Sequence, residues 1–157
     1  MSVSLESDVD VLKRIPFFQG FSPEHLKLIA FSAESRSLPD KLLLYDEGQL
    51  LHSAYVVISG TLRGTRKAKE GERAASREIG AGAMLGDRAL VLDLRADEAV
   101  RVESRARVFQ IRKVMFRRLM QEYPEIAVIL RSRLTRSVMQ AAADFNAVKE
   151  RLRAIEL

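Results

Sequence analysis

The 157-residue sequence contains no cysteine, which excludes disulfides, thiolate metal sites and a cysteine nucleophile. The absence of cysteine also favours a reducing compartment. The N-terminus lacks the basic start and the apolar run of a signal peptide, and no stretch approaches the roughly 18 apolar residues of a membrane span. We therefore expect a soluble cytoplasmic protein without a membrane partner.

Histidine is also scarce, since only His25 and His52 are present. Neither belongs to an HExxH pattern or has a carboxylate at a metal-ligand spacing, and there is no G-x-S-x-G nucleophile elbow. Asp97 and Glu98 are neighbours, but adjacent strand residues point to opposite faces and cannot flank one bond. We therefore expect no catalytic residue, no metal site and no enzymatic activity.

The composition is that of an ordinary globular protein, with 47% hydrophobic and 30% charged residues. The length allows one compact domain, with or without an appended helix. Twenty-six Lys and Arg against 21 Asp and Glu give a net charge of +5, which is modest for a nucleic-acid binder. The arginine-rich stretches 101–107 and 112–118 have few aromatic residues, so we interpret them as solvated faces.

The hydrophobic pattern changes twice along the chain. Ser7 is a candidate cap for a helix over residues 8–14, and Ser22 with Pro23 opens a second helix. From residue 35 to residue 111 the period is two, and a helix over residues 113–123 is expected to bury Val114, Leu119 and Met120. The expected strands lie at residues 42–45, 54–58, 61–63, 78–79, 99–102 and 107–111. Short strands separated by glycine turns indicate an all-β barrel or sandwich with flanking helices.

Pro124 is expected to begin a final long helix over residues 124–157. Apolar residues recur there at spacings of three and four, which is a heptad seam. The seam favours a parallel two-helix homodimer, or the same stripe could pack on its own barrel. The domains are then a β unit over residues 1–123 and a dimerisation helix over residues 124–157. The seam residues are Leu134, Val138, Ala141, Phe145, Val148, Leu152 and Ile155.

Several motifs occur in an order that resembles the cyclic nucleotide-binding domain of the catabolite-activator (Crp/Fnr) superfamily. Residues 12–26 are similar to the leading helix of that family, and residues 45–48 followed by 54–60 are similar to its strand core. The stretch 82–87 resembles the entry to the phosphate-binding cassette, and 116–134 the helices that follow it. The resemblance implies a jelly-roll-like β-roll with N-terminal helices, in which Gly48 and Gly60 lie at turns.

The glycine stretch 80–86 has the spacing GxGxxxG, which is not the dinucleotide fingerprint and by itself could be a barrel turn. The resemblance makes it a cassette that binds a cyclic phosphate through backbone N–H groups and an arginine, with a glutamate on the ribose 2′-hydroxyl. The candidate ligand-binding residues are Gly82, Leu85, Gly86, Asp87, Arg88, Ala89, Arg95, Ala96, Asp97 and Ala99.

The candidate cassette departs from the family pattern at four positions. Asp87 stands where the family has glutamate, Ala96 stands where it has arginine, and Asp97 and Glu98 replace small residues. Arg95 is one residue away, on the opposite face unless a bulge intervenes. Loss of the guanidinium is worth several kcal/mol, or roughly two decades of affinity.

Binding of cyclic AMP or cyclic GMP is therefore disfavoured, and no cofactor is certain. Retained binding would need Arg95, Arg88 or Arg101 to reach into the pocket. Otherwise Asp87 and Arg95 could pair with each other and fill it.

These expectations describe a small, non-enzymatic regulatory or sensor module that relays ligand or partner binding through its C-terminal helix. The coupling residues would be Leu119, Met120, Leu130, Leu134 and Phe145. The alternatives are a ligand-free scaffold with an unknown protein partner and a truncated Crp/Fnr-type regulator. Because the sequence stops at Leu157, without the helix-turn-helix domain of such regulators, DNA binding is not expected.

Overall fold

A computed structural model describes residues 2–133, with side chains from residue 7 onward. The chain divides into two compact units, Met1–Leu119 and Met120–Leu157. The first unit contains the β-roll, and the second begins within the last helix of the first. The seam residues from Leu134 to Ile155, and with them the expected dimer contact, lie outside the described residues.

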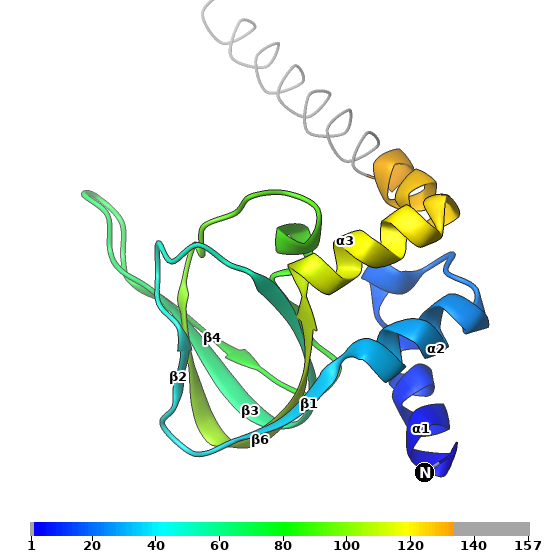
Figure 1. Ribbon diagram of the computed structural model, residues 1–157. Coiled ribbons are helices and arrows are strands. Elements are labelled where there is room, and N and C mark those ends of the chain that lie inside the picture. The colour runs from blue at the N-terminus through cyan, green and yellow to red at the C-terminus, as the bar shows by residue number, and fades with distance from the viewer. Residues whose placement is uncertain (1, 134–157) are drawn as a thin grey trace, which may run out of the picture. The chain divides into compact units, whose positions relative to one another are not determined.

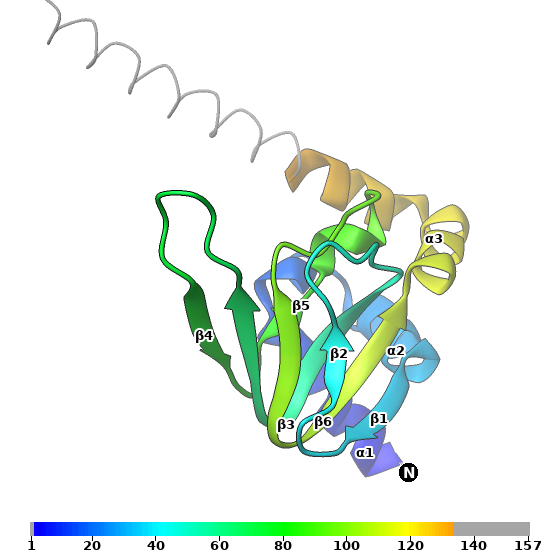
Figure 2. The same ribbon diagram turned by 90° about the vertical axis from the view of Figure 1, so that its left-hand side faces the viewer.

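One six-stranded antiparallel sheet curls into the β-roll (Figures 1 and 2). Its centre is the pair β3 (Ser53–Arg66) and β6 (Ala99–Arg112), each 14 residues long. β1 (Glu34–Leu38) and β2 (Leu43–Tyr45) pair with β6, whereas β4 (Ala75–Ile79) and β5 (Met84–Leu85) pair with β3. The expected jelly-roll-like fold is therefore confirmed.

Each central strand joins two segments that were expected to be separate. The stretch around Gly60 was expected to be a turn, but it lies inside β3. The pairing of β3 with β6 shifts register between Val57 and Leu62, so this is an irregular, bulged part of the ladder. Gly60 has a φ of +84°, and a Cβ there would lie 2.2 Å from the Arg105 carbonyl oxygen. A glycine is needed here because the facing strand passes too close for any side chain.

The interior of the roll is apolar and belongs to the strands. Buried side chains from every part of the sheet meet there, and in β6 they alternate with exposed residues over 100–103 and 105–108, whereas all of residues 108–111 are buried. The members from the long strands are Val57, Leu62, Val100, Val102, Ala106 and Val108. This core fixes which faces of β3, β4 and β6 point inward, and so positions the site described below.

Two helices and a 3-10 turn precede the roll. α1 spans Ser2–Lys13, which is earlier than the expected start at residue 8, so Ser7 lies within the helix. η1 is Pro16–Phe18, and α2 is Pro23–Ser32. Ser22 caps α2 as predicted, because its Oγ accepts a hydrogen bond from the His25 backbone N–H at 3.1 Å.

α3 (Lys113–Glu122) follows β6 without a loop. Its buried face was predicted correctly at Leu119 and incorrectly at Val114. Val114 is 68% exposed, whereas Phe116 is fully buried and its ring centroid lies 6.1 Å from that of Phe17. Leu119 is buried as expected, and Met120 is half-buried. Residues 113, 116 and 119 share one face of the helix, and Val114 is rotated about 100° away from Lys113.

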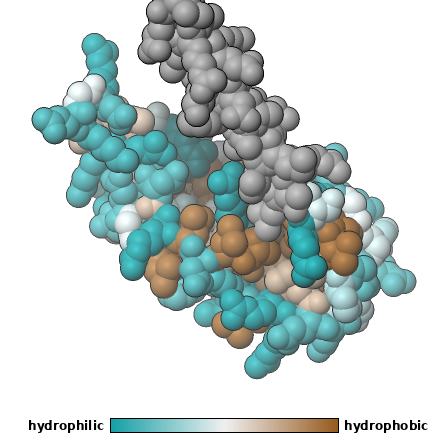
Figure 3. All heavy atoms as spheres, turned by 90° about the horizontal axis from the view of Figure 1, so that it is seen from above, coloured by the Kyte–Doolittle hydropathy of each residue, from teal (hydrophilic) through white to brown (hydrophobic). Residues whose placement is uncertain are grey.

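Residues 124–133 are helical and begin at Pro124, as expected. Within residues 2–133, none of the helices combines the length and the apolar character that a transmembrane segment requires. Figure 3 shows hydrophobic side chains interrupted by hydrophilic ones on the face seen from above.

Candidate functional site

The cassette begins where the glycine stretch leaves β4. Gly82 lies in the turn between β4 and β5 with a φ of +88°, and its N–H donates to the Val57 carbonyl at 2.8 Å. Gly86, with a φ of +71°, caps the short 3-10 helix η2 (Asp87–Leu90). The glycine stretch is therefore a tight turn followed by a short helix, and both glycines adopt a left-handed backbone that favours this residue.

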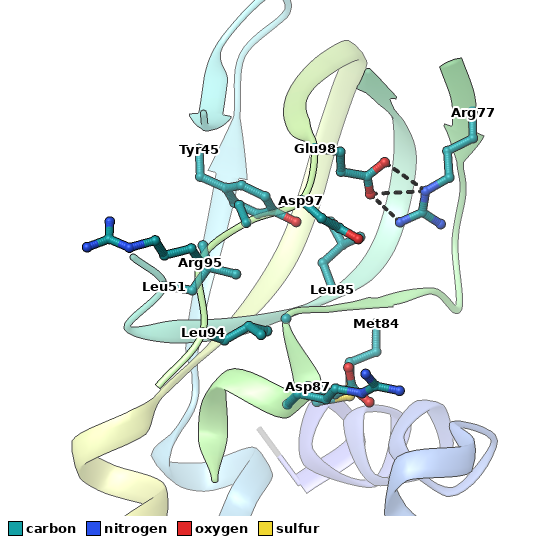
Figure 4. Close-up of a pocket in the computed structure, with 13 residues that line it drawn as sticks. Tyr45, Leu51, Arg77, Met84, Leu85, Asp87, Leu94, Arg95, Asp97 and Glu98 are labelled. Atoms are coloured by element: carbon teal, nitrogen blue, oxygen red, sulfur yellow. Dashed lines mark hydrogen bonds and ion pairs between the residues drawn. The ribbon is translucent and has the colours of Figure 1, made fainter. Parts of the chain in front are cut away.

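A pocket of about 450 Å³ opens between this cassette, β2 and β4 (Figure 4). Its size falls within the range of small-molecule sites. Most of the candidate residues reach it, namely Leu85, Gly86, Asp87, Arg88, Arg95, Ala96 and Asp97. The other three do not line it, because Gly82 lies in the preceding turn, Ala89 is fully buried and Ala99 opens β6. The lining also includes Glu98, noted above as a departure from the family pattern, and residues that sequence reasoning did not single out, namely Tyr45, Leu51, Arg77, Met84 and Leu94.

Ala96 and Arg95 differ in burial and in their partners. Ala96 is buried, its N–H donates to the Gln49 carbonyl at 2.8 Å, and its own carbonyl accepts from Gly48 N–H at 2.7 Å. Arg95 is exposed and its Nη1 donates to the Gly48 carbonyl at 3.1 Å. Figure 4 shows its guanidinium pointing away from Glu98 and Arg77. Arg95 therefore does not supply the missing guanidinium to the interior of the pocket.

The other two candidate arginines also differ in position. The Nη1 of Arg101 donates to the Lys41 carbonyl at 2.8 Å, and Arg101 does not line the pocket. Arg88 does line it, from η2. The expected pairing of Asp87 with Arg95 is not found among the described residues, because the Arg95 side chain is turned toward Gly48. A different ion pair occupies the pocket.

This pair joins Glu98 to Arg77. The Nε of Arg77 donates to both carboxylate oxygens of Glu98, at 3.0 and 3.1 Å, and Nη2 makes a further short contact with Oε1. The Glu98 side chain is 11% exposed and that of Arg77 is 58% exposed. The hydrogen bond to Glu98 raises the pKa of Arg77 above its ordinary value. A bidentate contact of this kind satisfies a carboxylate that has lost most of its water.

Gly64 explains why these two side chains can meet. In β3 it pairs with Arg77 of β4 on one side and with Val100 of β6 on the other. A Cβ at Gly64 would lie 2.3 Å from the Glu98 Oε2. The missing side chain therefore provides the space that the carboxylate fills between the strands. No sequence spacing indicates this contact, because Arg77 in β4 and Glu98, directly before β6, are brought together only by the pairing of β3 with β4 and β6.

Asp97 and Glu98 precede β6 and, contrary to the expectation for adjacent strand residues, both line the pocket, but they have different partners. The Asp97 side chain is 79% exposed, and its Oδ2 accepts from the Nη2 of Arg66 at 3.0 Å. With Arg66 and Arg77, the two acids also border a second hollow of about 390 Å³. Each of these two acids is therefore neutralised by an arginine of the β3 and β4 strands.

Tyr45 completes the interior of the pocket. Its ring stacks on Tyr55 with the centroids 6.3 Å apart. Burial raises the pKa of the Tyr45 hydroxyl, and the nearby Glu98 carboxylate raises it further. The hydroxyl therefore stays neutral. The deep end of the pocket thus holds a neutral phenol and a self-paired carboxylate and guanidinium. Within the part of the chain that is described, no group of three or more His, Asp or Glu residues forms a candidate metal site.

Comparisons with known proteins agree with this architecture. Residues 35–123, more than half of the chain, match the cyclic nucleotide-binding domain family. No curated protein matches the chain. A cyclic nucleotide-binding-like protein from Brucella abortus is 31% identical, with a TM-score of 0.66 over 73% of this chain and 98% of that one.

Two further solved structures share the fold at lower identity. The N-terminal domain of a transcriptional regulator from Streptomyces coelicolor is 19% identical, with a TM-score of 0.78 over 87% of this chain and 95% of that one. The catabolite activator protein of Thermus thermophilus is 21% identical, with a TM-score of 0.66 over 85% of this chain and 63% of that one. The family match, the β-roll and the cassette geometry agree, and the chain belongs to the cyclic nucleotide-binding domain family.

Proposed function

We propose that the protein is a small, non-enzymatic regulatory module in which binding of cyclic nucleotides is weakened or lost. Its family serves in regulators, among them the transcriptional regulator and the catabolite activator whose structures it resembles. In this proposal the roll senses another ligand or a partner protein. The C-terminal helix carries the response, in a cytoplasmic homodimer formed by its heptad seam.

The observation that carries the proposal is the ion pair of Arg77 with Glu98. Its guanidinium and its carboxylate both line the pocket, next to Ala96, where the family resemblance implies a phosphate-binding arginine. A cyclic phosphate would have to approach a nearly buried carboxylate and to compete with it for Arg77. The pocket is large enough for a small ligand, so charge, rather than size, disfavours the nucleotide.

The expected penalty can be estimated. A charge-assisted hydrogen bond is worth about 1.5–3 kcal/mol, and the site lacks at least one such bond from position 96. Repulsion by Glu98 adds to this loss. Together these terms weaken binding by roughly two decades relative to a site that has the arginine.

The test is calorimetric titration with cyclic AMP and cyclic GMP. The unmodified chain should give no heat at micromolar ligand. The double variant Ala96→Arg, Glu98→Ala supplies the guanidinium and removes the carboxylate, so it should bind about a hundredfold more tightly than the unmodified chain. Arg95→Ala is the matched control at the rim of the same pocket, and it should change nothing, because the Arg95 guanidinium bonds to the Gly48 carbonyl and points away from Arg77 and Glu98 (Figure 4). Micromolar binding by the unmodified chain that Arg95→Ala abolishes would overturn the proposal.

A ligand-free scaffold is the second candidate, and the self-paired pocket favours it as well. In that case the double variant would gain nucleotide binding but no other small molecule would stabilise the unmodified chain. A thermal-shift panel of nucleotides and small metabolites separates the two functions, because a sensor must be stabilised by its ligand. The truncated regulator is tested by the gene sequence beyond residue 157.

A further inference from the structure

One buried lysine, Lys113, does not line the pocket. Lys113 is 8% exposed and is the first residue of α3. Its Nζ donates to the Leu92 carbonyl at 3.0 Å and to the Asp93 Oδ1 at 2.5 Å. Both acceptors follow η2 at the end of the cassette helix, and Figure 1 shows this short helix beside the start of α3. The ammonium therefore ties the cassette to the helix that leaves the roll.

This position is unfavourable for a lysine in two respects. Burial removes water from its charge, and a positive charge at a helix N-terminus opposes the helix dipole. The Asp93 carboxylate and the Leu92 carbonyl offset both costs. The backbone of the same residue is also fixed, because Lys113 N–H donates to the His52 carbonyl at 2.9 Å. A residue that violates two local preferences and satisfies a specific pair of acceptors indicates a functional constraint.

The cassette segment beyond η2 has few other attachments. Leu92 is 48% exposed, and the side chain of Asp93 is 89% exposed. Leu92 N–H bonds back to the Arg88 carbonyl at 2.9 Å, within the cassette itself. The Leu94 carbonyl accepts from Leu51 N–H at 2.9 Å, which ties the segment to the pocket wall. Among these contacts, the bonds from Lys113 are the ones that reach α3.

We propose that Lys113 is a positioning residue that couples the cassette to α3. Displacement of the cassette, by whatever occupies the pocket, then either moves the first turn of α3 or breaks the bonds at Leu92 and Asp93. The use of this coupling in regulation rests on the proposed function. The coupling itself is a property of the protein without ligand.

The test is amide hydrogen exchange of the full chain without nucleotide. Lys113→Met keeps the aliphatic stem and removes the ammonium, and Asp93→Asn removes the carboxylate at an exposed position. In both variants the amides of residues 88–93 should exchange about tenfold to a hundredfold faster, while the amides of residues 117–119 stay unchanged. The matched control is Arg112→Gln, the adjacent residue, whose pair with Glu34 is exposed on both sides. It should leave the exchange of the cassette as it is.

A role in stability alone predicts a different pattern, in which exchange rises by the same factor in the cassette and in α3. That result, or a cassette unchanged in both variants, would overturn the proposal. If Lys113→Met does not fold, the result for Asp93→Asn alone tests the proposal, because a substitution at this exposed side chain leaves the fold intact. Because no nucleotide is present, the outcome is independent of the titration that tests the proposed function.

Discussion

Replacement of Arg77 by leucine should destabilise the protein by about 2 kcal/mol. Removing one partner of a buried ion pair costs about 3–5 kcal/mol, whereas an exposed pair is worth about 0–1 kcal/mol. This pair lies between the two, because the Glu98 side chain is 11% exposed and that of Arg77 is 58% exposed. A loss of that size lowers Tm by about 4–8 °C in a chain of this length. Urea unfolding followed by circular dichroism measures the free energy directly.

The matched control for this prediction is Arg63→Leu on the neighbouring strand. Arg63 pairs with Glu103, and the two side chains are 39% and 44% exposed, so the loss should stay below about 1 kcal/mol. Adding Glu98→Gln to Arg77→Leu should recover part of the stability, because the uncompensated charge is then gone. Equal losses from the two arginine variants would show that Glu98 does not need a partner and would refute the reasoning.

Three further predictions concern Gly64, Gly60 and the bond between Lys113 and Asp93. Gly64→Ala places a Cβ 2.3 Å from the Glu98 Oε2, so it should cost about 1–2 kcal/mol in urea unfolding, and the cost should vanish in a Glu98→Ala background. Gly60→Ala should lower the free energy of unfolding more than Gly71→Ala does in the same assay. Both glycines have a φ above +80°, but of the two only Gly60 faces the backbone of β6. Similar losses of stability would contradict this prediction. The hydrogen bond from Lys113 lowers the pKa of Asp93 below its ordinary 3.8. The ionised Asp93 therefore stabilises the folded protein fully above pH 3.8, and this contribution is lost as the pH falls through the pKa of the folded state. Asp93→Asn should remove this part of the pH dependence of the free energy of unfolding. An unchanged dependence would contradict the role given to the bond between Lys113 and Asp93.

The sequence predicted the fold class because the signals for it are local. Glycine turns and short apolar runs recur over residues 35–111, and Ser22 with Pro23 caps a helix that the structure contains. The errors also have local causes. β1 was not among the expected strands because Leu38 is its only buried residue, and α1 begins earlier than Ser7 because acids and polar residues continue its helix. β3 was divided because Gly60 was interpreted as a turn at a site where it forms a bulge, and β6 was divided because its middle residues 103–105 are polar.

The candidate site was predicted in part. Most of the candidate cassette residues line the pocket, including Asp87, Arg88 and Ala96. The identity of the partner of Glu98 could not be predicted from the sequence. Arg77 is 21 residues away in sequence and meets it only across Gly64, so the contact depends on the pairing of three strands.

The sequence by itself determined the family and the β-roll, because both follow from the order and the period of nearby residues. Only the tertiary structure decided what fills the pocket and what holds the cassette. The pairs of Arg77 with Glu98 and of Lys113 with Asp93 join segments about 20 residues apart. Such contacts depend on strand register and on burial, which no local pattern encodes.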